Sequence, residues 1–164
     1  MPDGSRRGPG IAGQLLLAPV TDSDTTRPSY QENGEGYILT SGLMQWFWDH
    51  YAEPADRDDP RASPLRAKDL SNLPPAMIVT AEFDPLRDEG VAYAQALLAA
   101  GVPVRLLQAR GHTHTSLTMV DVVLSGAAVR AEMATALREF FRAAEAPGGG
   151  RPPVPPPVRA VAPA

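Results

Sequence analysis

The sequence contains no cysteine, one lysine and no long hydrophobic run. The absence of cysteine and of long hydrophobic runs excludes several classes of protein. Without cysteine there is no disulfide framework, thiolate metal site or cysteine nucleophile. No apolar run approaches the roughly 18 residues that span a bilayer, and the opening MPDGSRRGPG lacks the apolar stretch of a signal peptide. Lys68 is the single lysine among 15 basic residues, and the formal net charge is −4. We therefore expect a cytoplasmic protein with no nucleic-acid partner and no membrane span.

The many prolines are distributed unevenly and set the C-terminus apart from the rest of the chain. Residues 147–164 read PGGGRPPVPPPVRAVAPA, with no hydrophobic period and few charges. Such a segment buries too little apolar surface to offset the entropy of ordering it. We expect one ordered domain over residues 11–146 and a disordered Pro/Gly-rich tail over residues 147–164. A Pro-rich ligand for a partner domain is the alternative interpretation of this tail.

Short apolar runs alternate with amphipathic stretches within residues 11–146. The sequence predicts strands over residues 14–18, 75–80 and 102–108, and helices over residues 41–51, 85–100 and 129–144. This order predicts parallel strands joined by right-handed crossovers, and therefore an α/β fold with a layered sheet. Three strands are few for such a sheet, because both of its edges also need protection.

Side chains capable of acid–base chemistry follow the second and third predicted strands. Asp84 comes after the second strand, and His112 and His114 come after the third. Neighbouring parallel strands lie about 4.8 Å apart and end at the same edge, so an acid and an imidazole there can meet. A carboxylate that accepts from Nδ1 leaves Nε2 free as a general base. Two other interpretations stay open: Asp84 caps a helix before Pro85, or the histidines are loop residues or an H-x-H metal pair.

Several blocks of the sequence together carry a family resemblance. They are GQLLLAPVTD at 13–22, LMQWFWDHY at 43–51, SPL at 63–65, LPPA at 73–76, DPLRDEG at 84–90 and Gly111-x-x-His114. With these blocks, residues 11–142 resemble the hormone-sensitive-lipase-like carboxylesterases, a branch of the α/β-hydrolases also called α/β-hydrolase fold-3. The resemblance implies a partial α/β-hydrolase fold, in which about three parallel strands with flanking helices are the last three of the family sheet.

The resemblance also implies roles for the residues that follow the strands. Asp84 is then the acid and His114 the base of a Ser-His-Asp triad, His112 occupies a variable position, and no metal or organic cofactor takes part. The implied substrate is a small acyl ester. The family histidine is commonly followed by Gly-Phe, whereas Thr115 and Ser116 stand here.

The helix predicted over residues 41–51 is rich in large apolar side chains. Leu43, Phe47 and Tyr51 recur at i, i+4 and i+8, with Trp46 and Trp48 beside them. We interpret these side chains as core packing, since apolar stripes at helical spacing usually face the core. The alternative is that the aromatic residues form a wall of the substrate pocket that the family builds in this region.

The nucleophile that such a triad needs is missing from the sequence. No serine stands in a G-x-S-x-G motif, and there is no His-Gly-Gly-Gly loop to supply oxyanion donors. The resemblance therefore implies an ester hydrolase fragment that supplies the acid and the base and is inactive alone. The first hypothesis is that it is the C-terminal half of a carboxylesterase, left by truncation, gene decay or a misplaced start codon. A separately encoded complementing N-terminal half is a further hypothesis. The alternative function is a non-catalytic remnant or binding module that pairs with another chain.

Overall fold

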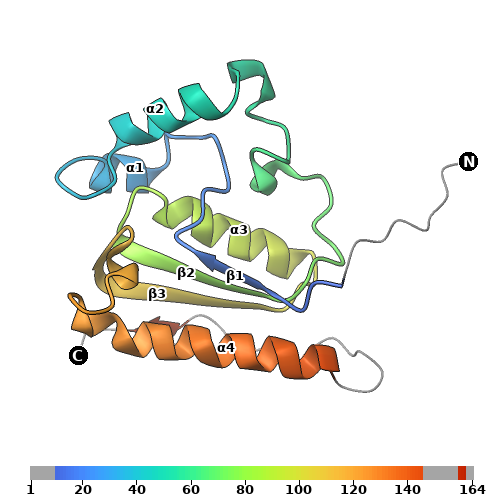
Figure 1. Ribbon diagram of the computed structural model, residues 1–164. Helices are drawn as coiled ribbons and strands as arrows, with labels where there is room; N and C mark the ends of the chain where they lie inside the picture. Colours follow the sequence, from blue (N-terminus) through green and yellow to red (C-terminus); the bar gives the residue numbers. More distant parts are fainter. Residues whose placement is uncertain (1–9, 146–158, 162–164) are drawn as a thin grey trace, which may run out of the picture.

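Parallel strands form a single sheet in the computed structural model, which describes residues 10–145 and 159–161 (Figure 1). The strands are β1 (Gln14–Leu17), β2 (Ala76–Phe83), β3 (Val104–Thr113) and β4 (Arg159–Val161), in that spatial order. The α-helices are α1 (Pro28–Asn33), α2 (Ser41–Tyr51), α3 (Arg87–Ala99) and α4 (Ala127–Glu145). The 3₁₀ helices are η1 (Pro54–Asp56), η2 (Pro64–Arg66), η3 (Ser116–Thr118) and η4 (Leu124–Gly126). The predicted α/β fold, with the parallel strands β1 to β3 and flanking helices, is confirmed.

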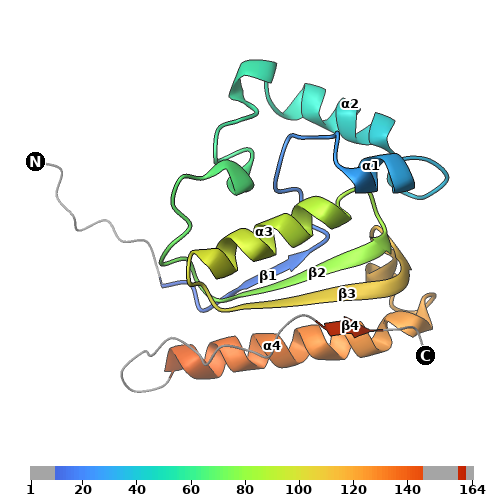
Figure 2. The same ribbon diagram turned by 180° about the vertical axis from the view of Figure 1, so that it is seen from behind.

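Helices cover the sheet on both faces, as parallel strands require. Helix α3 packs on one face, with α1 and α2 on the same side, and α4 packs on the other (Figures 1 and 2). On β2, Ile78 packs with Leu97 of α3. Its neighbours Met77 and Val79 pack with Phe140 of α4. Because successive side chains point to opposite faces, β2 is buried at every position from 76 to 81.

Strand β4 lies in a segment for which the sequence predicts disorder. Of the predicted tail 147–164, the structure describes only residues 159–161, and these pair in parallel with β3. These three residues contain no proline, so their backbone can pair with the open edge of β3. The disorder of the tail as a whole stays a prediction. The other residues of the predicted tail lie outside the described part of the chain.

Helix α2 begins where the sequence predicts but buries a different face. The Thr40 hydroxyl caps it by accepting the Leu43 N–H at 3.1 Å. Met44 and Trp48, four residues apart, are its buried side chains and pack with Tyr30 of α1, with Leu39, and with Leu86 just before α3. The interpretation as core packing is therefore confirmed for Trp48. It is wrong for Leu43, Trp46, Phe47 and Tyr51, which are all exposed.

Two element boundaries differ from the predictions in ways that matter for the site. Helix α3 begins at Arg87 rather than at residue 85, because residues 84–86 form the turn that leads into it. Strand β3 continues to Thr113, beyond the predicted end at residue 108. No helix among the described residues combines the length and the apolar character that a membrane span needs.

Candidate active site

Asp84 directly follows β2, and its carboxylate is fully buried. Its Oδ1 accepts the Leu86 N–H at 2.9 Å, which closes the turn before α3. Its Oδ2 lies 2.9 Å from Nδ1 of His114. The interpretation of Asp84 as a helix cap is wrong, because the N-cap residue of α3 is Leu86 and has no side-chain cap. One carboxylate oxygen of Asp84 closes the turn before the helix, and the other faces the imidazole.

His114 directly follows β3, and its imidazole is about one-fifth exposed, with a side-chain exposure of 20%. Asp84 is the only hydrogen-bond partner of this ring within residues 10–145 and 159–161. Because a carboxylate accepts hydrogen bonds, Nδ1 is the nitrogen that carries the proton. The opposite nitrogen, Nε2, is then the basic one. The expectation that the two side chains meet beyond the strand ends is confirmed; their catalytic role is taken up below.

A bulge in β3 brings the two residues into register. Ala81 pairs with Ala109, but two residues later Phe83 pairs with Thr113, so β3 carries two extra residues here. Gly111 lies in the bulge with φ +74°, a conformation that suits glycine, and its N–H donates to Glu82 Oε2 at 2.7 Å. The next residues after Phe83 and Thr113 are Asp84 and His114.

His112 has separate surroundings from His114. Its ring is buried, and its Nδ1 lies 3.1 Å from the Ser116 hydroxyl. That hydroxyl donates to the Thr113 carbonyl at 2.9 Å, so Ser116 accepts the His112 Nδ1 proton. Among the residues that the structure describes, no three His, Cys, Asp or Glu side chains converge as a metal site would require.

Thr115 follows His114 in the left-handed backbone region, with φ +60°. A β-branched residue is strained there, whereas glycine is not. The glycine that commonly follows the family histidine thus has a physical reason, and Thr115 replaces it with strain. Thr115, the residue that departs from the family pattern, is therefore next to His114 in the sequence but takes no part in the contact between His114 and Asp84.

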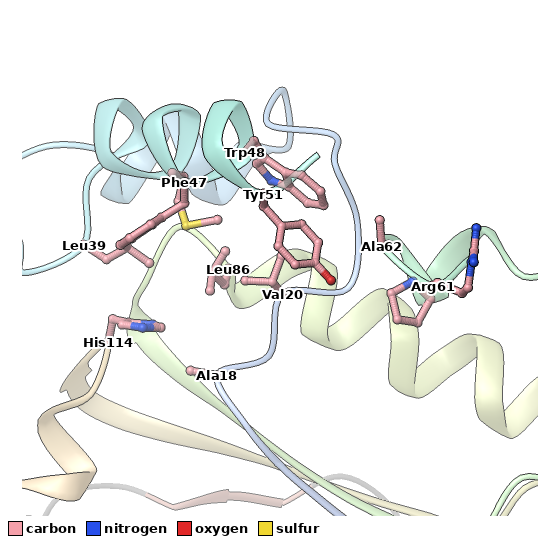
Figure 3. A pocket seen from close by; sticks show the side chains of 12 residues that line it. Ala18, Val20, Leu39, Phe47, Trp48, Tyr51, Arg61, Ala62, Leu86 and His114 are labelled. Atoms are coloured by element: carbon pink, nitrogen blue, oxygen red, sulfur yellow. The ribbon is translucent and has the colours of Figure 1, made fainter. Parts of the chain in front are cut away.

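An apolar cavity of about 500 Å³ opens above His114 (Figure 3). Helix α2 forms its roof with Phe47, Trp48 and Tyr51, and Val20 forms part of a side wall. The volume and the mainly apolar lining are typical of a small-molecule site. The alternative interpretation of the aromatic helix, as a pocket wall, thus describes Phe47 and Tyr51 better than core packing does.

Glu89 is a buried acid near the cavity that the sequence interpretation missed. Burial raises the pKa of Glu89 to about 7, against hydrogen bonds from Thr21, Asp22 and Tyr30 that lower it. Burial and the nearby Glu89 also raise the pKa of Tyr30. In the sequence, an acid in the first turn of a helix indicates only a favourable charge at the helix N-terminus. The adjacent Gly90, which permits close packing, is the one further signal.

The comparisons with known proteins agree with this geometry. A family model described as alpha/beta hydrolase fold matches residues 3–118. The ethyl acetate hydrolase of Pseudomonas putida is 47% identical over 111 residues, which cover 67% of this chain and 35% of that protein. A carboxylic ester hydrolase of Mycobacterium tuberculosis, LipN, is 44% identical over 133 residues, which cover 80% of this chain and 35% of that protein.

Solved structures extend the similarity to three dimensions. A thermostable esterase from Pseudomonas putida matches with a TM-score of 0.71 and 45% identity, over 79% of this chain and 41% of that one. The thermostable carboxylesterase EstE1, cloned from a metagenomic library, matches with a TM-score of 0.75 and 36% identity, over 79% of this chain and 45% of that one. The chain thus spans less than half the length of these relatives. It belongs to the α/β-hydrolase fold family, in the branch of hormone-sensitive-lipase-like carboxylesterases.

Proposed function

We propose that this chain supplies the acid and the base of a serine-dependent carboxylic ester hydrolase. The observation that carries the proposal is the 2.9 Å contact between the buried Asp84 carboxylate and Nδ1 of His114, at the floor of an apolar cavity. The relatives named as ester hydrolases support the reaction class. No metal or organic cofactor enters this mechanism.

In the proposed mechanism, His114 moves protons and Asp84 holds it in place. Nε2 of His114 takes the proton from a serine hydroxyl as that oxygen attacks the ester carbonyl. The tetrahedral intermediate collapses, and the leaving alcohol takes the proton from Nε2, which leaves an acyl-serine. Water then gives a proton to the same nitrogen as it attacks the acyl group. The second tetrahedral intermediate collapses, the serine oxygen takes that proton back from Nε2, and the carboxylic acid is released. Throughout, the Asp84 carboxylate stabilises the imidazolium.

In this proposal, a complementing N-terminal half supplies the serine and the oxyanion donors. The sequence of this chain has no G-x-S-x-G motif, and it covers only 35% of the Pseudomonas putida relative. Because the hydroxyl and the oxyanion donors account for most of the catalysis in such sites, we expect the chain to be inactive alone.

The proposed substrate is a small neutral acyl ester. Phe47, Trp48 and Tyr51 offer an apolar surface to an alkyl or aryl group, while the cavity floor brings the ester bond to His114. A chain of one or a few carbons fits a cavity of about 500 Å³ with room to spare. The ethyl acetate hydrolase of Pseudomonas putida bears a name that fits this class.

A fusion protein tests the proposal. The part of the Pseudomonas putida ethyl acetate hydrolase that precedes its matched segment is joined to this chain, and hydrolysis of 4-nitrophenyl acetate is measured. We expect activity in the fusion, its loss by at least about a thousandfold in His114→Ala, and its retention in His112→Ala. An active His114→Ala fusion, or loss in His112→Ala alone at unchanged stability, would overturn the assignment of the base.

A further inference from the structure

Glu89 lies in the first turn of α3, is fully buried, and has no part in the proposed mechanism. Its Oε1 accepts the Thr21 N–H at 2.6 Å and the Asp22 N–H at 3.3 Å. Its Oε2 accepts the Tyr30 hydroxyl at 3.2 Å. All three partners are donors, so the surroundings of this carboxyl group match its charged form.

The backbone that Glu89 holds is a wall of the cavity. We call residues 18–22, which follow β1, the wall loop; Ala18 and Val20 in this loop line the cavity (Figure 3). Ala18 has φ +45°, a strained conformation for alanine that persists only where surrounding contacts impose it. The Thr21 hydroxyl adds a further bond, to the Glu89 carbonyl at 3.0 Å.

Gly90 lets the first turn of α3 approach the wall loop closely. A Cβ at this position would lie 2.8 Å from Cγ2 of Thr80 and 3.8 Å from Cδ of Pro19. A side chain at residue 90 would therefore clash with Thr80 of β2, while its contact with Pro19 of the loop would be an ordinary one. The carboxylate of Glu89 reaches Thr21 because its neighbour has no side chain.

The same two residues of the wall loop also hold a second side of the cavity. The Thr21 carbonyl accepts the Leu65 N–H at 2.9 Å, and Asp22 Oδ1 accepts from Nε of Arg66 at 2.7 Å. Leu65 and Arg66 belong to η2, whose first residue, Pro64, lines the cavity. Displacement of Thr21 and Asp22 would therefore move two walls together.

We propose that Glu89 is a positioning residue for the substrate pocket: its carboxylate holds the wall loop, and through it Val20 and Pro64, opposite helix α2. This inference rests on the proposed function only in naming the cavity a substrate pocket. The hydrogen bonds by which Glu89 holds the wall loop, here called the grip, do not depend on that function.

The grip depends on the charge of the carboxyl group. The charged and titratable groups around it are Asp22 and Arg27 between β1 and α1, Tyr30 of α1, Arg66 of η2, Asp84 after β2, and Asp88 of α3. With a pKa of about 7, Glu89 takes up a proton just below neutral pH. The proton goes to Oε2, where the Tyr30 hydroxyl must turn to accept it, and the hydrogen bonds from Thr21 and Asp22 then end on a neutral group. These bonds are weaker than those to a carboxylate.

A pH titration by NMR on the full chain tests the proposal between pH 5 and pH 9. In the wild type, we expect the Thr21 amide, the Val20 methyl groups and the Trp48 indole N–H to shift together, with one midpoint near 7. Glu89→Gln keeps the shape and the neutral charge of the protonated acid. In this variant we expect the three signals to stay near their low-pH positions throughout. Glu132→Gln on α4, across the sheet, is the matched control and should titrate like the wild type.

Two results would overturn the proposal. One is a Glu89→Gln chain with Val20 and Trp48 signals equal to those of the wild type at pH 9. The other is a titration near 7 that persists in this variant when His114 on the cavity floor is also replaced by alanine. If Glu89→Gln does not fold, Tyr30→Phe decides: loss of this donor should raise the common midpoint above the wild-type value, and an unchanged midpoint contradicts the grip. The fusion assay could show that His114 is not the catalytic base without changing any of these NMR signals, because they are recorded on the full chain without a reaction. The two proposals can therefore fail separately.

Discussion

Glu82 Oε2 accepts the Gly111 N–H at 2.7 Å, and this hydrogen bond spans the bulge that places His114 beside Asp84. The bulge needs a residue with positive φ, and Gly111 has φ +74°. The geometry of the acid–imidazole pair thus depends on a glycine three residues before the histidine.

Gly111→Ala is expected to destabilise the chain by about 1–2 kcal/mol, the cost of a Cβ in the left-handed region. It should also loosen the contact between Asp84 and His114, because the bulge sets their register. Urea denaturation measures the stability, and the His114 imidazole signals report the contact. A variant as stable as the wild type, with unchanged imidazole signals, would refute this role of the bulge.

Thr115→Gly should have the opposite effect. Thr115 has φ +60°, and glycine removes the strain of about 1–2 kcal/mol, partly offset by the larger entropy of an unfolded glycine. We expect a net gain of up to about 1 kcal/mol in the free energy of unfolding. Thr118→Gly is the control, because Thr118 has no positive φ and therefore no such strain to relieve. The substitution removes the hydrogen bond from the Thr118 hydroxyl to the Thr115 carbonyl, so this variant should be less stable. A loss of stability in Thr115→Gly would count against strain at this position.

Two aromatic residues of α2 should separate stability from ligand binding. Trp48 is buried, so Trp48→Ala should lower the free energy of unfolding by about 3–5 kcal/mol. Tyr51 is 68% exposed yet lines the cavity, so Tyr51→Ala should change stability by less than about 0.5 kcal/mol. In the active fusion, however, Tyr51→Ala should raise KM for 4-nitrophenyl acetate. Equal effects of both variants on stability would contradict the assignment of faces on this helix.

Glu89 should make stability depend on pH. Its folded pKa of about 7 lies above the ordinary value of 4.5, so the folded state binds its proton more tightly than the unfolded state does. Stability from this group is therefore complete below about pH 4.5 and is lost as the pH rises to about 7. Glu89→Gln should remove this loss, so that the variant is more stable than the wild type at pH 8. Urea denaturation at pH 5 and pH 8 checks the sign; a variant less stable at pH 8 would contradict it.

This expected gain distinguishes positioning from a purely structural role. The charged Glu89 costs stability because it is buried, yet it is the form whose oxygens match the donors of the wall loop. If Glu89→Gln is more stable but has a displaced wall loop, Glu89 positions the pocket at a cost in stability.

The sequence predicts the strands and the identity of the paired residues well, for simple reasons. The apolar run around Ile78 admits few alternatives to a buried strand, and strand ends share one edge of a parallel sheet. That edge predicts that Asp84 meets an imidazole, whereas the bulge at Gly111 sets the register that brings His114 to it.

What the sequence does not predict depends on contacts distant along the chain. The bulge at Gly111 is spanned by a hydrogen bond to Glu82, which lies 29 residues earlier in the sequence. The buried face of α2 is set by the core that Trp48 meets, although Leu43 and Phe47 have the same helical spacing. Apart from the adjacent Gly90, Glu89 has no local sign of burial, because Thr21 and Tyr30 reach it from a separate part of the sequence.

The central claim is tested most directly by the tautomer of His114 in the full chain, read from the ¹⁵N signals of its ring. In the wild type, the account predicts that the neutral tautomer of the ring carries its proton on Nδ1, held by Asp84 Oδ2. In Asp84→Asn, the amide oxygen remains with the Leu86 N–H, and the amide nitrogen then faces the ring. The account therefore predicts that the proton moves to Nε2. A wild-type ring with its proton on Nε2, or a tautomer that Asp84→Asn leaves unchanged, would contradict it.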